Sequence, residues 1–149
     1  MQDSIAGTQE HINKVQVRVA EVQAVLDQRA AMHDRSKLKE PEKSGFDRLS
    51  GRLAQLTYGT DEYRAALAEA KDTIAHHYAH NSHHPEHYAN GIAGMSLLDV
   101  IEMLCDWKAA SERTKQGSIQ QSLPINRERF GISDQLYAIL ENTVRELGW

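Results

Sequence analysis

The chain has 149 residues, of which 40% are hydrophobic and 26% are charged, a composition that fits a folded domain and excludes an extensively disordered chain. Its formal net charge of −4 gives no broad electrostatic basis for tight nucleic-acid binding. The single cysteine, Cys105, excludes an internal disulfide and is typical of a reducing cytosol.

The composition also predicts fold class and location. Alanine, leucine, glutamate and glutamine are plentiful, whereas runs of β-branched and aromatic residues are scarce, which favours an all-α single domain over residues 1–149. No apolar run approaches the ~20 residues of a membrane span, and the N-terminal residues lack the pattern of a secretory signal. We therefore expect a cytoplasmic protein that does not contact a membrane.

A long first helix is predicted from about residue 4 to residue 38. Apolar side chains recur there at steps of three and four residues, which places them in one stripe along a helix. The stripe consists of Ile5, Ile12, Val15, Val19, Val22 and Leu26. We expect it to face a core and to continue to His33, so that this imidazole points inward.

Two helices are predicted next, followed by an irregular segment. The second helix carries Phe46, Leu49, Leu53 and Leu56. Tyr58-Gly59 is a stop signal, and Thr60 or Asp61 then begins a third helix that reaches His80. Pro85 disfavours helix immediately before it, so residues 81–94 are expected to be irregular but locally fixed.

Two more helices complete a bundle of about five. Ser96 is the expected cap of the helix SLLDVIEMLCDWKAASERT, and Gly117 ends it. The stretch SIQQSLPINRERFGI is predicted to be a connection with a short turn of helix. Ser133 then caps a last helix from Gln135 to Leu147.

Six of the eight histidines lie in one short stretch, HHYAHNSHHPEHY. The third helix presents His77 on the same face as Ile74, so His77 is expected to point inward, whereas His76 and His80 are interpreted as polar side chains on another face. His83 and His84 follow the end of that helix, where a loop can direct an imidazole toward the core. A purification tag would be terminal and uninterrupted, which excludes that interpretation.

Two further groups offer carboxylates. His33 and Asp34 are adjacent, and imidazole and carboxylate are suitable ligands for a divalent transition metal, although an aspartate paired with a lysine is the simpler interpretation of the dipeptide. Asp99, Glu102 and Asp106 lie at i, i+3 and i+7, on one helix face. They form either a solvated acidic stripe or, at Asp106 above all, a ligand position.

Helix geometry separates His11 from this group. His11 and His33 are 22 residues apart, or about 33 Å along an unbroken helix, so they cannot share an ion. Lys37 lies one turn after His33 and could place a positive charge beside a phosphate, as could Lys108 or Arg129. For each of the three, a solvent-facing side chain is the alternative.

The motifs together resemble those of the HD superfamily of metal-dependent phosphohydrolases, which are helical proteins. His33-Asp34 is similar to the His-Asp pair of that superfamily, and Asp106 to its distant aspartate; a histidine from residues 77–84 takes the place of the first histidine. The chain also resembles an uncharacterised family of short proteins common in bacteriophage and bacterial genomes, through HDRSKL, NSHHPEHY and MSLLDVIEMLCDW. If a phage encodes the chain, its location is the host cytoplasm.

These resemblances imply an HD-like bundle with a mono- or binuclear metal site. The expected ligands are His33, Asp34, His77, His84 and Asp106, with His83 as the nearest substitute. Ligands of nitrogen and oxygen type suit one or two ions of Mn, Fe, Co, Ni or Zn, and the lack of cysteine pairs argues against a zinc finger.

The implied reaction is hydrolysis of a phosphate ester in a small molecule, with a nucleotide as the expected substrate. Lys37, with Lys108 or Arg129, would bind phosphate oxygens, and Glu102 would transfer a proton or orient a ligand. One alternative is a helical binding protein whose metal only joins helices. Another is a small histidine-metal nuclease suggested by NSHH, which would need a β-hairpin before its helix. The sequence does not decide whether the protein forms a homodimer.

Overall fold

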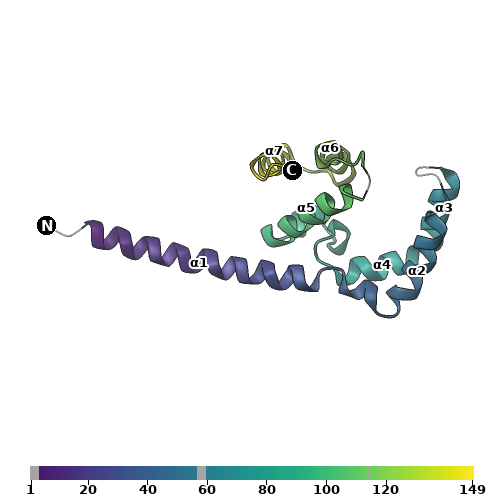
Figure 1. Ribbon diagram of the computed structural model, residues 1–149, viewed down its shortest axis with the longest axis horizontal. Coiled ribbons are helices and arrows are strands. Elements are labelled where there is room, and N and C mark those ends of the chain that lie inside the picture. Colours follow the sequence, from purple (N-terminus) through teal and green to yellow (C-terminus); the bar gives the residue numbers. More distant parts are fainter. Residues whose placement is uncertain (1–3, 57–59, 114) are drawn as a thin grey trace. The chain divides into compact units, whose positions relative to one another are not determined.

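The computed structural model describes residues 4–56, 60–113 and 115–149, and these residues contain helices and no strands (Figure 1). The α-helices of this part of the chain are α1 (Ser4–Met32), α2 (Glu42–Leu53), α3 (Asp61–Glu69), α4 (Lys71–His80), α5 (Leu97–Ser111), α6 (Ile119–Phe130) and α7 (Asp134–Glu146). Three short 3₁₀ helices join them: η1 (Arg35–Leu38), η2 (Pro85–His87) and η3 (Gly91–Gly94). The all-α prediction is confirmed, but the expected number of about five helices is too low.

The chain forms two compact units, the first ending at His33 and the second beginning at Asp34. Within both units, no described helix is long and apolar enough to cross a membrane. The expectation of one domain over residues 1–149 stays a prediction, as does an HD-like arrangement of the helices.

The first unit is the single helix α1, which ends earlier than the sequence predicts. Asp34 adopts a left-handed backbone conformation with φ of 56°, which an α-helix does not contain, so the helix stops at Met32 instead of continuing to residue 38. No residue of Ser4–Met32 is buried. The predicted apolar stripe is therefore not covered within its own unit, where the Val19 side chain is 51% exposed and the Ile12 side chain 42% exposed, and the expected core is not found there. Periodicity defines which side chains share a face, but not what covers that face.

In the second unit, α2 and α4 pack closely because a glycine lies at their crossing. A Cβ atom on Gly45 would lie 2.6 Å from Thr73 Cγ2, so only glycine fits there. Thr60 accepts a hydrogen bond from the backbone of Tyr63 and caps α3, as predicted. The stop at Tyr58-Gly59 lies outside the described residues.

The helix predicted from Asp61 to His80 is two helices, α3 and α4, divided at Ala70. The amide of Ala70 is shared between the carbonyls of Ala66 and Leu67, which marks a local tightening of the backbone. The apolar spacing passes through this point without a change, so the sequence pattern does not reveal the division.

The last three helices surround the main core of the described chain. Its buried members are Val100, Met103, Leu104, Ile119, Leu123, Ile132, Leu140 and Val144. Trp107 and Phe130 stack at its edge, with ring centroids 5.8 Å apart. Ser96 and Ser133 cap α5 and α7 as predicted.

Residues 118–132, which were expected to be a connection, contain the full helix α6. Pro124 lies inside this helix, where it removes one backbone hydrogen bond. Ile119 and Leu123 are nevertheless buried on the helix face that meets α5 and α7. Burial of this face outweighs the local cost of the proline, so the prediction from local signals was wrong.

Candidate metal centre

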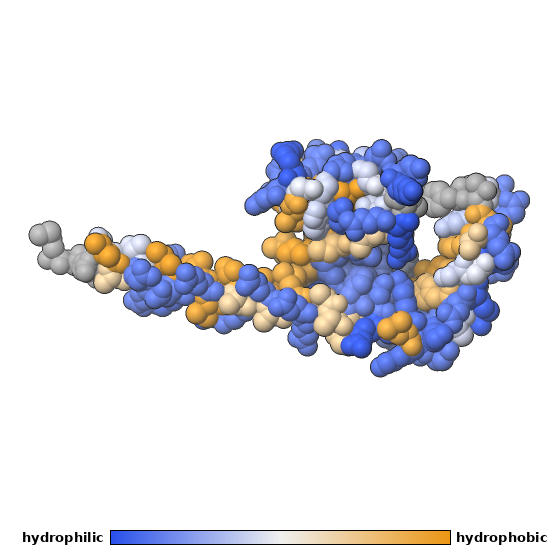
Figure 2. Space-filling view, viewed as in Figure 1, coloured by the Kyte–Doolittle hydropathy of each residue, from blue (hydrophilic) through white to orange (hydrophobic). Residues whose placement is uncertain are grey.

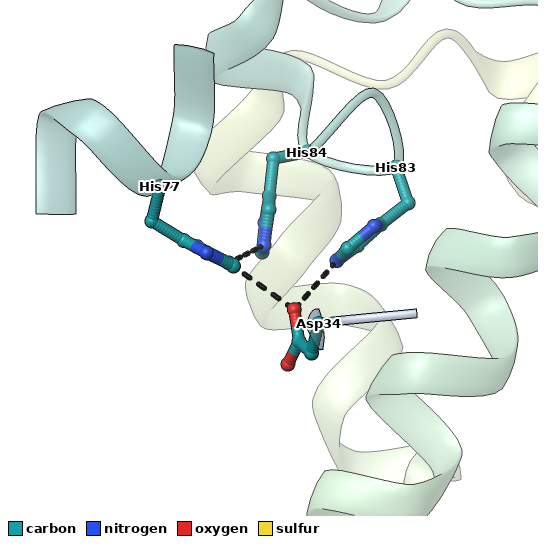
Figure 3. A group of neighbouring side chains, drawn as sticks. All are labelled: Asp34, His77, His83 and His84. Atoms are coloured by element: carbon teal, nitrogen blue, oxygen red, sulfur yellow. Dashed lines mark hydrogen bonds and ion pairs between the residues drawn. The ribbon is translucent and has the colours of Figure 1, made fainter. Parts of the chain in front are cut away.

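Four side chains of the second unit converge at one point: Asp34, His77, His83 and His84 (Figure 3). Each contributes one ligand atom, and the four atoms all lie within 4.8 Å of one another. His77 and His83 are each only 2% exposed, and Asp34 and His84 are half-buried. Nitrogen and oxygen donors that converge in this way form a group that could hold a divalent metal ion.

Each of these side chains is positioned by a local feature of the backbone. Asp34 lies in the left-handed turn that precedes η1, a conformation that aspartate tolerates better than most residues. His77 lies in the last turn of α4 and, as its position predicted, points inward. His83 and His84 follow the end of that helix, and the buried Pro85 then starts η2.

The distances between donors are suited to a common ion. Asp34 Oδ1 lies 3.3 Å from His77 Nε2 and 3.6 Å from His83 Nε2. Two ligand atoms that are each about 2.1 Å from a tetrahedral ion lie about 3.4 Å apart, so both separations fit. His77 Nε2 and His84 Nε2 are closer, at 2.9 Å. The donor set therefore fits a small divalent cation once the imidazoles of His77 and His84 move slightly apart.

Behind His77 lies a carboxylate that the sequence analysis missed. Glu42, at the start of α2, is 0% exposed, and its Oε2 lies 2.9 Å from His77 Nδ1. Burial raises the pKa of Glu42, but hydrogen bonds from Ser36, His76 and His77 outweigh it and leave the pKa below its ordinary value. The carboxylate is therefore charged and can only accept, so Nδ1 of His77 donates. Nε2 of a neutral His77 then presents its lone pair toward Asp34 and His84.

His83 has an equivalent arrangement on the other side. Its Nδ1 lies 3.2 Å from Glu102 Oε1, while its Nε2 faces Asp34. Glu102 is therefore placed where it can orient an imidazole, one of the two roles that the sequence suggested for it. Carboxylates that hold the outer nitrogen of a histidine are the usual support of histidine ligands in metal sites, because they fix the tautomer and the ring orientation.

The third imidazole is kept neutral by its surroundings. Burial, followed by the proximity of His83 and His77, lowers the pKa of His84 to about 3, although Asp106 acts in the opposite direction. At neutral pH the ring is uncharged, which is the form that binds a metal.

Lys37 lies at the edge of this group, near the position that the sequence suggested. Its ammonium lies 2.6 Å from Asp34 Oδ2 and 5.3 Å from the centroid of the Phe46 ring. The pairing of an aspartate with a lysine, which was the simpler interpretation of the dipeptide, therefore exists. Asp34 uses one oxygen for Lys37 and directs the other to the histidines.

The remaining predicted site residues are not members of the four-residue group. His33 is half-buried and is the last residue of the first unit. Asp106 is half-buried on α5 and influences the pKa of His84, but it is not a member of the four-residue group. Lys108 pairs with Glu112 at 2.7 Å, and Arg129 pairs with Glu86 at 2.8 Å. Ligand roles for His33 and Asp106, and phosphate binding by Lys108 and Arg129, stay predictions.

Asp99 differs from the other acidic residues of α5, because it anchors the histidine loop. Its carboxylate accepts hydrogen bonds from Ser82, Tyr88 and the capping residue Ser96. Burial raises its pKa, but these hydrogen bonds outweigh burial and lower the pKa below its ordinary value. Asp99 is therefore neither part of a solvated stripe nor a member of the four-residue group. The spacing of Ser96 and Asp99 was a capping-box signal that could have revealed this.

Two polar residues missed by the sequence analysis join the segments around His77. Ser36 donates to Glu42 Oε2 at 2.7 Å, and the Asn81 amide donates to Ser36 Oγ at 2.9 Å and to the His77 carbonyl at 2.7 Å. Both lie inside the motifs HDRSKL and NSHHPEHY. Their position within these motifs could have revealed both residues from the sequence. Glu42 had no such signal, because a glutamate in the first turn of a helix is common and usually exposed.

Comparison with known protein families gives a match. The model of a family described as a family of unknown function, DUF5662, matches residues 1–146. The chain belongs to the DUF5662 family. No curated protein and no solved structure matches it. Because the description of DUF5662 names no activity, the chemistry of this member must be inferred from its own residues.

Proposed function

We propose that this protein is a metal-dependent phosphohydrolase that acts on a nucleotide or a related phosphate ester. The observation that carries the proposal is the pair of supported imidazoles. His77 directs its Nδ1 to Glu42, and His83 directs its Nδ1 to Glu102. Both rings direct Nε2 to the same oxygen of Asp34. An arrangement that only fills a core would not need two carboxylates to orient two lone pairs toward one point.

The proposed ligands of a first ion are Asp34, His77, His83 and His84. His33 and Asp106 are the candidates for a second ion, from their resemblance to the HD pattern. Imidazole and carboxylate donors suit Mn, Fe, Co, Ni or Zn. A bound ion of this kind supplies a water of lowered pKa and polarises a phosphoryl group.

The chain's own residues would position the substrate. Lys37 is close enough to Asp34 to bind a phosphate oxygen beside the donor group, and its ammonium would then exchange one anionic partner for another. Glu102 holds the His83 ring in place, so a role in proton transfer would compete with that contact. We therefore assign Glu102 to positioning.

One observation favours a second candidate, a non-catalytic metal-stabilised binding protein such as a phage accessory factor. Four donors are enough to fill a tetrahedral site, and closed four-ligand sites are typical of structural metals. The two candidates differ in one measurable property. A phosphohydrolase must leave a coordination position for water or substrate, whereas a structural site need not.

The first experiment is elemental analysis of untagged protein, followed by a phosphate-release screen of nucleotides with Mn, Co and Ni. Bound metal together with phosphate release would support the phosphohydrolase. A stoichiometric metal without turnover on any nucleotide would support the binding protein. Protein that neither retains nor takes up these metals would contradict both.

Variants then test the ligand set. Asp34→Ala is expected to lose both metal and turnover, and Asp106→Ala to lose the second ion and turnover. His11→Ala is the control and should keep its metal, because His11 lies about 33 Å from His33 along α1. Full metal content in Asp34→Ala would show that the four-residue group is not the site.

A further inference from the structure

The function proposed above assigns no role to the exposed apolar stripe of α1, which has a regular spacing. The stripe follows a seven-residue repeat written a to g, in which a and d face a partner helix. Positions a are Ile5, Ile12, Val19 and Leu26, and positions d are Thr8, Val15, Val22 and Arg29. From Ile5 to Leu26 the seam spans about 32 Å, and Thr8 is the one polar residue within it.

The stability of α1 as a helix indicates that another surface covers this seam. α1 has 29 residues, none of them buried, and many of its side chains are β-branched, which lowers helix propensity. Helices in proteins are stabilised mainly by packing of an apolar face, so an apolar stripe of this length is normally covered. Figure 2 shows the apolar side chains of α1 lying on its surface among polar ones.

The residues beside the seam identify the occupant as another copy of the same helix. The e positions are Gln9, Gln16 and Gln23, which are neutral. Charged residues near the seam are neutralised within the helix, because Arg18 pairs with Glu21 and Lys14 pairs with Glu10. A different partner is normally selected by charges at e and g, and α1 presents no unbalanced charge there for such selection.

The same flanks also favour a parallel, in-register alignment. In a parallel pair each g residue lies beside the e residue five positions later on the neighbouring helix. Arg18 then meets Gln23, His11 meets Gln16, and the apolar Val25 meets Ala30. In an antiparallel pair centred on the seam, Arg18 would lie beside Arg18 of the other copy. Although each Arg18 pairs with Glu21, this contact between like groups is less favourable than Arg18 beside Gln23.

We infer that α1 is a self-association helix, which joins copies of this chain through a parallel coiled coil along Ile5–Leu26. The groove beside Val15, Val19 and Val22, flanked by Lys14 and Arg18, receives the a and d side chains of the neighbouring copy. Leucine at d is the usual choice for two strands, whereas valine occupies the central d positions here, so assembly of more than two chains is favoured.

A matched pair of full-length variants tests the inference by light scattering during gel filtration. Wild-type protein is expected to have the mass of two or more associated chains. Val19→Asp places a charge in the seam and should give a monomer. Val17→Asp changes the same residue type at an f position, outside the seam and equally exposed at 52%, and should leave the oligomer intact. A wild-type monomer at all concentrations, or equal behaviour of the two variants, would overturn the inference.

Cross-linking tests orientation without disrupting α1. In a Cys105→Ala background, Val22→Cys should form an intermolecular disulfide on mild oxidation, because parallel chains place residue 22 beside itself. Ala24→Cys, at an outward f position, should remain largely uncross-linked. Efficient cross-linking at residue 24, or an oligomer without cross-linking at residue 22, would contradict the parallel arrangement.

Discussion

Glu42 and His77 form a buried acid–imidazole pair, although 35 residues separate them in the chain. Oε2 of Glu42 accepts from His77 Nδ1 at 2.9 Å, and this contact turns the opposite nitrogen of the ring toward Asp34. The pair links α2 to α4 and makes Glu42 part of the candidate metal centre without making it a ligand.

Glu42→Gln should therefore weaken metal binding by about 10–100-fold, the usual effect of removing the partner of a histidine ligand. The amide keeps the shape of the side chain but loses the negative charge that fixes the tautomer of His77. Titration of metal-free protein with Co or Zn measures the effect. Glu40→Gln, an exposed glutamate that contacts Ser44, is the control and should bind metal normally. Equal affinities in the two variants would show that the pair is only structural.

Lys37→Ala should reduce phosphate release while leaving metal content unchanged. Lys37 contacts Asp34 through the oxygen that faces away from the histidines, so its loss leaves the donor atoms in place. A raised KM is expected if the ammonium binds substrate phosphate in the ground state, and a lowered kcat if it binds mainly in the transition state. The neighbouring Lys39 is exposed, and Lys39→Ala is the control. Unchanged kinetics in Lys37→Ala would remove Lys37 from the substrate site.

Asp99 should make the fold sensitive to acid. Its pKa in the folded protein is below the ordinary value of 3.8, so its charged form stabilises the fold. This stabilisation is complete above about pH 5 and is lost as the pH falls further, because the unfolded chain then binds the proton more readily. In the presence of a metal chelator, the free energy of unfolding of Asp99→Asn should change less with pH below pH 4 than that of the wild type. The exposed Asp47→Asn should keep the wild-type slope.

Gly45→Ala should destabilise the protein by about 1–3 kcal/mol, the typical cost of overpacking. The added methyl group would overlap the Thr73 side chain and separate α2 from α4, which together hold Glu42 against His77. Gly51→Ala is a matched control on the same helix, where a Cβ atom meets nothing within 4 Å. That variant should gain about 0.5–1 kcal/mol from helix propensity. Urea unfolding of both proteins measures the difference, and a stable Gly45→Ala would contradict the close packing.

The sequence predicted features that depend on neighbours along the chain. Caps at Thr60, Ser96 and Ser133 were predicted from residue type, because a hydroxyl satisfies free amides only a few residues away. The inward direction of His77 followed from its spacing with Ile74. His83, His84 and Asp34 were recognised as donors because imidazoles and carboxylates gathered within short motifs.

Features that depend on distant neighbours could not be read in this way. α6 forms around Pro124 because α5 and α7 bury its apolar face, and local signals alone predicted a connection. Asp99 and Asp106 share a helix face in the sequence, yet Asp99 anchors a loop, whereas Asp106 acts to raise the pKa of His84, which burial lowers.

The amino-acid sequence by itself determined the helical class, the heptad spacing of α1 and the side chains able to bind a metal, since all three depend on residue type and local period. The tertiary structure alone decided that Glu42 is buried behind His77 and that Asp34 turns one oxygen toward three imidazoles. Those relationships arise because separate segments pack together, and the free energy of such packing depends on burial and hydrogen bonds between residues that are far apart in the chain.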